Sequence, residues 1–98
     1  MNKKLEFEEI KRKLIPILRK NKVTKAGIFG SYARGEQNAK SDVDILIKIN
    51  DRVGLVEFIN LKMAIEELLR KKVDLVEYDT IRPEIKDNII RDEISILS

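Results

Sequence analysis

The chain has 98 residues, 43% of them hydrophobic, which is enough for one hydrophobic core but not for two, so residues 1–98 are expected to form a single domain. It contains no cysteine and no histidine, which excludes disulfides, thiolate nucleophiles and cysteine zinc sites and leaves carboxylates as candidates for metal binding and acid–base chemistry. The net charge is only +3, and Lys and Arg are interspersed with Glu and Asp, which favours a solvated surface over a nucleic-acid-binding patch.

The first predicted element is a helix from Leu5 to about Leu18. Its apolar residues recur every three or four positions, the spacing of one stripe along a helix. They are Phe7, Ile10, Leu14, Ile17 and Leu18. Pro16 lies inside this pattern and has no N–H, so we expect a kink or a break near Ile15. Asn21 is expected to end the helix.

Two predicted strands flank a short turn region. Residues 23–29 include Val, Thr, Ile and Phe and stop at a glycine, which is typical of a strand. Ser31 is then expected to cap a helix of one or two turns, and the polar run 37–41 to form a loop. From Asp42 to Ile49, apolar residues alternate with other residues, which predicts a second strand with one well-buried face.

The second half of the chain continues the alternation of helices and strands. The predicted elements are a turn at 50–54, a helix at 55–70, a strand at 73–78, a helix at 82–91 and a short edge strand at 93–97. The basic run 70–72 suits the negative end of the helix before it. Pro83 suits the first turn of the last helix, with Ile85, Ile89 and Ile90 facing inward.

This order of elements favours a two-layer α/β (α+β) domain, with helices covering one face of a small sheet. The connection from Gly30 to Asp42 is too short for a crossover helix, so the first two strands are expected to be antiparallel neighbours. The end of the first strand then lies beside the start of the second. Gly30, Ser31, Asp42 and Asp44 therefore share one corner of the predicted sheet.

The two aspartates of that corner point to a metal ion. On a strand, Asp42 and Asp44 lie roughly 6–7 Å apart and, at an effective dielectric constant of about 20, repel each other by roughly 2–3 kcal/mol. Asp74 adds comparable repulsion if its strand is adjacent. Because a divalent cation reverses this balance, a Mg²⁺ site explains the cluster better than structural polar residues do.

The small residues before the aspartates point to a phosphate. Gly30 and Ser31 carry no bulky side chain, so their N–H groups and the hydroxyl can approach a phosphate closely. In a two-metal arrangement, Asp42 and Asp44 would bridge ions that hold a triphosphate, while Asp74 would help ligate the second ion and accept the proton of an attacking hydroxyl. The motif thus indicates transfer of a phosphorus-containing group from a nucleotide.

Three residues near the motif have alternative interpretations. Asp74 could face solvent as an acidic residue in an apolar strand. Arg34 could neutralise phosphate, or it could pair with Glu36 or with an aspartate of the sheet. Tyr32 is expected to pack rather than to take part in catalysis.

The spacing of Gly30-Ser31, ten residues and Asp42-Val43-Asp44 resembles the signature of the DNA polymerase β-type nucleotidyltransferases. Nearly the whole chain resembles their minimal members, the MNT or MntA-like antitoxins. The resemblance implies a mixed sheet, Mg²⁺ bound by Asp42, Asp44 and Asp74, and ATP phosphates held at Gly30 and Ser31.

The resemblance also implies a partner. Minimal members of this kind neutralise a HEPN-domain ribonuclease toxin by transferring AMP from ATP to a tyrosine near its active site. Two alternatives stay open: an antitoxin that masks the toxin by contact alone, and a nucleotidyltransferase acting on a small hydroxylated molecule. No apolar run approaches the roughly 20 residues of a membrane span, and the first residues lack the apolar segment of a signal peptide, so a cytoplasmic location is expected.

Overall fold

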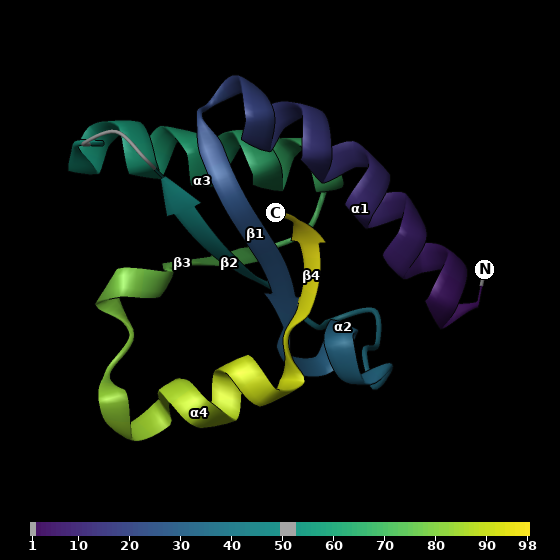
Figure 1. Ribbon diagram of the computed structural model, residues 1–98. Helices are drawn as coiled ribbons and strands as arrows, with labels where there is room; N and C mark the ends of the chain where they lie inside the picture. The colour runs from purple at the N-terminus through teal and green to yellow at the C-terminus, as the bar shows by residue number, and fades with distance from the viewer. Residues whose placement is uncertain (1, 50–52) are drawn as a thin grey trace.

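A four-stranded mixed sheet with strand order β3-β2-β1-β4 forms the centre of the molecule (Figure 1). In the computed structural model, which describes residues 2–49 and 53–98, β1 (Val23–Phe29) pairs antiparallel with β2 (Val43–Ile49) and β4 (Ile94–Leu97). β2 also pairs in parallel with β3 (Val73–Glu77). The predicted antiparallel neighbours and the predicted edge strand are both confirmed.

One face of the sheet is covered by α1 (Lys3–Lys20) and α3 (Leu55–Leu69), which contact each other and pack on β1 and β3 (Figure 1). This face follows from the alternation in β2, because every second residue of a strand points to the same side. Fully buried residues of the resulting core include Leu14, Leu18, Ala26, Ile28, Val43, Ile45, Ile47 and Ile65. The predicted α+β class with a small mixed sheet is confirmed, and α1 and α3 pack on one face of that sheet, as expected.

On the opposite face, a tyrosine and a glutamate cover the middle of the sheet. The Tyr78 hydroxyl, in the short helix η1 (Tyr78–Thr80), donates a hydrogen bond to the Glu93 carboxylate. That carboxylate fills the space that the missing side chain of Gly27 leaves on β1, and burial raises the pKa of Glu93. The Lys25 ammonium lies 4.8 Å from the centre of the Tyr78 ring. η1 was not anticipated by the sequence pattern.

Of the kink or break predicted near Ile15, the break is wrong, and the kink stays a prediction. α1 runs without interruption from Lys3 to Lys20, with Asn21 as its C-cap, as expected. Proline removes one hydrogen bond to the carbonyl four residues earlier, but Pro16 is exposed, so water can solvate that carbonyl. Burial of the stripe Ile10, Leu14 and Leu18 on both sides of Pro16 stabilises the continuous helix.

The predicted capping role of Ser31 is also wrong. α2 (Gly30–Arg34) begins two residues earlier than a cap at Ser31 implies, with Phe29 at the N-cap and no side-chain capping bond. The chain turns directly from β1 into this helix because Gly30 adopts a φ of +70°, which only glycine adopts readily. Ser31 therefore lies within the first turn, and the predicted length of one or two turns is confirmed.

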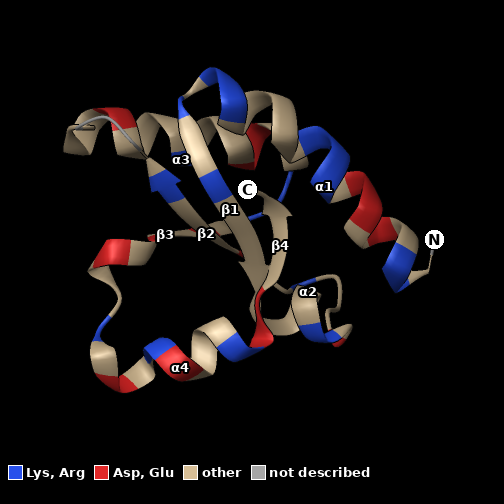
Figure 2. Ribbon diagram, viewed as in Figure 1, with Lys and Arg blue, Asp and Glu red and all other residues tan. Residues whose placement is uncertain are grey.

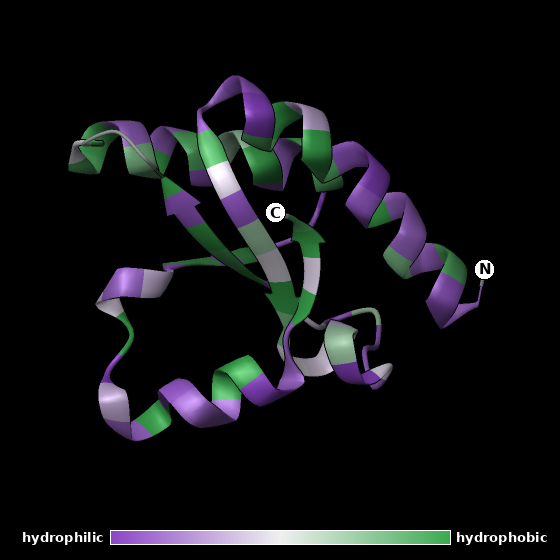
Figure 3. Ribbon diagram, viewed as in Figure 1, coloured by the Kyte–Doolittle hydropathy of each residue, from purple (hydrophilic) through white to green (hydrophobic). Residues whose placement is uncertain are grey.

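The last helix, α4 (Pro83–Asp92), lies on the other side of the strands from α1 and α3 (Figure 1). The predicted inward orientation is wrong for Ile85 and Ile90, which are 48% and 41% exposed, and Ile89 is only partly buried. α4 contacts α2 and β1 but adds no residue to the core, so its hydrophobic bands stay on the surface (Figure 3).

The remaining boundaries lie close to the predicted ones. β2 begins at Val43 and β3 ends at Glu77, each one residue inside its predicted range, whereas the predicted turn at 50–54 lies partly outside the described residues. Figure 2 shows acidic and basic residues interspersed along α1 and α4. Among residues 2–49 and 53–98, there is no helix that combines the length and the apolar character needed to cross a bilayer.

Candidate active site

Gly30 and Asp44 meet at the corner where β1 ends and β2 begins. Phe29 lies opposite Asp44 in the antiparallel pair, and Gly30 follows at once. A Cβ atom on Gly30 would overlap the Oδ2 atom of Asp44. The turn therefore requires glycine for two reasons, its positive φ and the close approach of its backbone to the carboxylate.

Asp74 joins the same corner from the third strand. In the parallel pairing of β2 with β3, Asp44 lies opposite Asp74, and the Val43 N–H donates to the Lys72 carbonyl at 2.9 Å. Neighbouring strands are about 4.8 Å apart, so the two carboxylates are close. Asp42 lies one residue before β2 instead of within it, and both Asp42 and Asp74 are exposed.

The negative charges of Asp42 and Asp74 act on the carboxyl group of Asp44. Burial, followed by the charges of Asp74 and Asp42, raises the pKa of Asp44 to about 6. The Arg34 charge acts in the opposite direction on this pKa. The start of β2 therefore holds a partly buried carboxylate whose ionised form is unfavourable unless a cation compensates it.

The donor set of this corner fits Mg²⁺ in its chemistry, because three carboxylates on the rigid ends of two strands supply the hard oxygen ligands that this ion prefers. In the described part of the chain, no three acidic side chains converge on one point as ligands around an ion. Asp42 and Asp74 are exposed, so solvent surrounds their carboxylates and leaves room for an ion. Metal binding by Asp42, Asp44 and Asp74 stays a prediction.

Arg34 is held by two carboxylates. Its Nη1 lies 3.0 Å from Oδ2 of Asp92 in α4, and its Nε lies 3.4 Å from Oε2 of Glu36. These bonds raise the pKa of Arg34. The pairing with Glu36 was one of the two predicted alternatives, whereas Asp92 was missed because 58 residues separate it from Arg34 in the sequence.

Tyr32 packs in the core, as expected, and is 2% exposed. Its hydroxyl is buried and has no hydrogen-bond partner among the described residues. The Lys71 ammonium lies 6.0 Å from the centre of the Tyr32 ring. Tyr32 therefore connects α2 with the segment that precedes β3.

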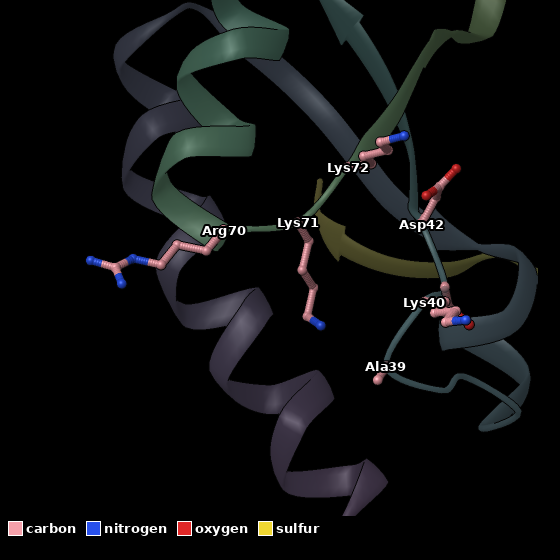
Figure 4. Close-up of a pocket in the computed structure, with 7 residues that line it drawn as sticks. Ala39, Lys40, Asp42, Arg70, Lys71 and Lys72 are labelled. Atoms are coloured by element: carbon pink, nitrogen blue, oxygen red, sulfur yellow. The ribbon is translucent and has the colours of Figure 1, made fainter.

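The sequence analysis missed a basic pocket beside Asp42. The pocket has a volume of about 350 Å³ and is lined by Ala39, Lys40, Ser41, Asp42, Arg70, Lys71 and Lys72 (Figure 4). The run 70–72 had suggested only a helix end, because the sequence alone does not show that it faces the loop 39–42. The available signal was the position of three cations directly before the strand of Asp74.

A glycine turn beside a carboxylate, with one further carboxylate just before the same strand and another on the neighbouring strand, is an arrangement suited to phosphoryl-group chemistry. Residues 12–98 match the family model described as Polymerase beta, Nucleotidyltransferase. The chain belongs to this family and is a nucleotidyltransferase.

Two relatives are similar in sequence. A Methanocaldococcus jannaschii protein, provisionally named protein adenylyltransferase MJ0435, is 45% identical over 93 residues, covering 95% of this chain and 100% of the relative. The protein adenylyltransferase MntA of Thermococcus cleftensis is 38% identical over 74 residues, covering 76% of this chain and 75% of the relative.

Two solved structures are similar in fold. One is a toxin–antitoxin crystal structure with AMP-PNP, with a TM-score of 0.81 and 26% identity over 90% of this chain and 73% of that chain. The other is a complex of a tri-AMPylated Shewanella oneidensis HEPN toxin with an MNT antitoxin, with a TM-score of 0.76 and 21% identity over 94% of this chain and 72% of that chain. At 21% identity, the second likeness shows the shared fold alone.

Proposed function

We propose that this chain is a Mg²⁺-dependent antitoxin that transfers AMP from ATP to a tyrosine of a HEPN-type ribonuclease toxin. The observation that carries this proposal is the corner in which Gly30 touches Asp44 and Asp44 lies opposite Asp74. Similarity to protein adenylyltransferases and to a toxin–antitoxin complex with an ATP analogue supports the protein acceptor and the nucleotide.

Each residue of the corner has a role in this proposal. The Gly30 backbone and the Ser31 hydroxyl hold the phosphates, while Asp42, Asp44 and Asp74 hold Mg²⁺, which supplies charge neutralisation at the phosphates. The tyrosine oxygen bonds to the α-phosphorus, the bond from that phosphorus to the β-phosphate oxygen breaks, and pyrophosphate leaves. Asp74 accepts the phenolic proton.

The proposal also covers the domain organisation, the cellular location and the partners of the chain. Residues 1–98 act as one minimal nucleotidyltransferase domain in the cytoplasm, without direct binding of membrane or nucleic acid. The acceptor tyrosine comes from the toxin, in keeping with the names of the two relatives as protein adenylyltransferases.

A labelling experiment tests the proposal. With α-labelled ATP, Mg²⁺ and the product of the neighbouring gene, the wild type is expected to label that product. Asp44→Asn should lower the rate at least 100-fold, since it removes a charged ligand at the reacting phosphate. Asp87→Asn, the same change at an exposed position of α4, is the matched control and should label normally. Absence of labelling by the wild type with every nucleotide tried would contradict the proposal.

The same variant separates the two alternatives. An antitoxin that acts by contact alone would still neutralise the toxin after Asp44→Asn. An enzyme for a small hydroxylated acceptor would consume ATP with that molecule in the absence of any toxin. The names of both relatives as protein adenylyltransferases favour a protein acceptor over a small molecule.

A further inference from the structure

The basic pocket lies on the flank of the candidate active site away from the glycine turn. Its lining comes from the loop 39–42 and from the connection 70–72 between α3 and β3. Gly30, Ser31 and Asp44 do not line it. In the sheet, β2 lies between β1, which leads into Gly30, and β3, which follows Lys72. The pocket and the glycine turn are therefore separated by the start of β2.

The lining of this pocket is mainly basic, with Lys40, Arg70, Lys71 and Lys72 against the one carboxylate of Asp42. Across residues 2–49 and 53–98, no carboxylate lies within ion-pair distance of Lys40, Lys71 or Lys72. Figure 4 shows Lys71 pointing down into the space beside Ala39, Lys72 on the same side as Asp42, and Arg70 pointing away. Three ammonium groups around one cavity favour an anion, because each added negative charge relieves their mutual repulsion.

We propose that the pocket is a second phosphate site, separate from the nucleotide phosphates proposed at Gly30 and Ser31. Lysine ammonium groups bind phosphate as mobile point charges, and a volume of about 350 Å³ accommodates a pyrophosphate or a phosphodiester with its neighbouring groups. The Asp42 carboxylate points away from Lys71 (Figure 4).

The identification of the bound phosphate as a reaction product rests on the proposed function. The inference that the pocket binds a phosphate does not. Two products of AMP transfer carry the required chemistry: the pyrophosphate released from ATP, and the phosphodiester between tyrosine and AMP on an acceptor that is already modified. Both arise next to Asp42 and Asp74, at the border of the pocket. A site for the phosphodiester would hold the modified acceptor near the corner after transfer.

Calorimetric titration tests the site directly. The protein is first saturated with AMP-PNP and Mg²⁺ to fill the nucleotide site, then titrated with pyrophosphate and, separately, with the phosphodiester of tyrosine and AMP. At least one probe is expected to bind, and the probe that binds identifies the source. The double change Lys71→Gln/Lys72→Gln should weaken binding roughly tenfold or more, as expected for losing charged hydrogen bonds.

Two further variants keep the test specific. Lys20→Gln/Lys86→Gln removes the same charge from exposed positions of α1 and α4 and should leave binding unchanged. Lys71→Arg/Lys72→Arg keeps the charge and should retain binding, which separates loss of charge from loss of fold. The proposal is overturned if neither probe binds, or if the control pair weakens binding as much as the pocket pair. Failure of the proposed function would instead show as absent AMP transfer with phosphate binding intact.

Discussion

At the scale of single residues, Asp44 combines a proposed role in metal binding with a cost to the stability of the folded protein. Its carboxylate is partly buried, touches the Gly30 backbone and lies opposite Asp74. These surroundings raise its pKa from 3.8 to about 6. Because the folded state binds this proton more tightly than the unfolded state, ionised Asp44 lowers stability. The loss is absent below about pH 4, grows as the pH rises towards 6 and is complete above it.

Asp44→Asn is therefore expected to stabilise the metal-free protein at pH 7 while it abolishes activity. The gain is on the order of 1–2 kcal/mol, less than the full shift implies, because solvent screens a partly exposed carboxylate. Thermal unfolding from pH 4 to pH 8 measures it, and the difference from wild type should appear between pH 4 and 6. A destabilised variant at pH 7 would refute this account of Asp44.

Gly30 and Gly35 form a matched pair of glycines. Both have a φ of +70°, but a side chain at Gly30 would overlap Asp44, whereas a side chain at Gly35 would meet no atom within 4 Å. Gly35→Ala should cost only the backbone strain, about 1–2 kcal/mol. Gly30→Ala should cost more and lower AMP transfer at least tenfold, because it displaces the Asp44 carboxylate. Equal losses of stability and activity in the two variants would argue against the close approach.

At the scale of elements, α3 shows how one helix divides between core and surface. Ile65 is fully buried between α3 and the sheet, whereas Met63, two residues earlier, is 60% exposed. Ile65→Ala should destabilise the protein by about 2–4 kcal/mol through lost burial and a cavity. Met63→Ala should change stability by less than about 0.5 kcal/mol. Chemical denaturation measures both, and similar values would contradict the observed orientation of α3.

Most elements of this fold could be predicted because their apolar residues recur at the regular spacing of a strand or of a helix. The alternation in β2 and the stripe of α1 each point to one covered face, and the structure places them there. The errors have local causes. Pro16 is exposed, so the helix tolerates it, and α4 packs on α2 instead of the core, although its isoleucines follow a helical stripe. An amphipathic pattern predicts a helix but does not name the surface that it covers.

The candidate site was predictable to the extent that its residues are close in sequence. Gly30, Ser31, Asp42 and Asp44 lie on one short segment, and antiparallel pairing follows from the short connection. Asp74 lies at this corner because β2 pairs in parallel with β3. The same pairing brings the connection 70–72 to the pocket that it shares with the loop 39–42. That pairing is a property of the assembled sheet, and no local pattern specifies it.

At the scale of the whole molecule, the proposed binding of Mg²⁺ at the carboxylate corner predicts that stability depends on the metal. An ion that binds only the folded state stabilises it by mass action, by about 2.7 kcal/mol at a concentration 100 times the dissociation constant. Mg²⁺ is therefore expected to raise the melting temperature of the wild type and to leave that of Asp44→Asn almost unchanged. Differential scanning calorimetry with and without Mg²⁺ checks this, and an equal rise in both proteins would place the ion elsewhere.

The alternation of β2 also restricts which strand pairings the chain can adopt. A slip of one residue relative to β1 or β3 would turn Asp44 towards α1 and α3, and would bring Val43, Ile45 and Ile47 out of the core. An unpaired carboxylate in that core would cost several kcal/mol. Asp44 lowers the stability of the native sheet but destabilises the slipped register more strongly, so its charge helps to specify the register in which the chain folds.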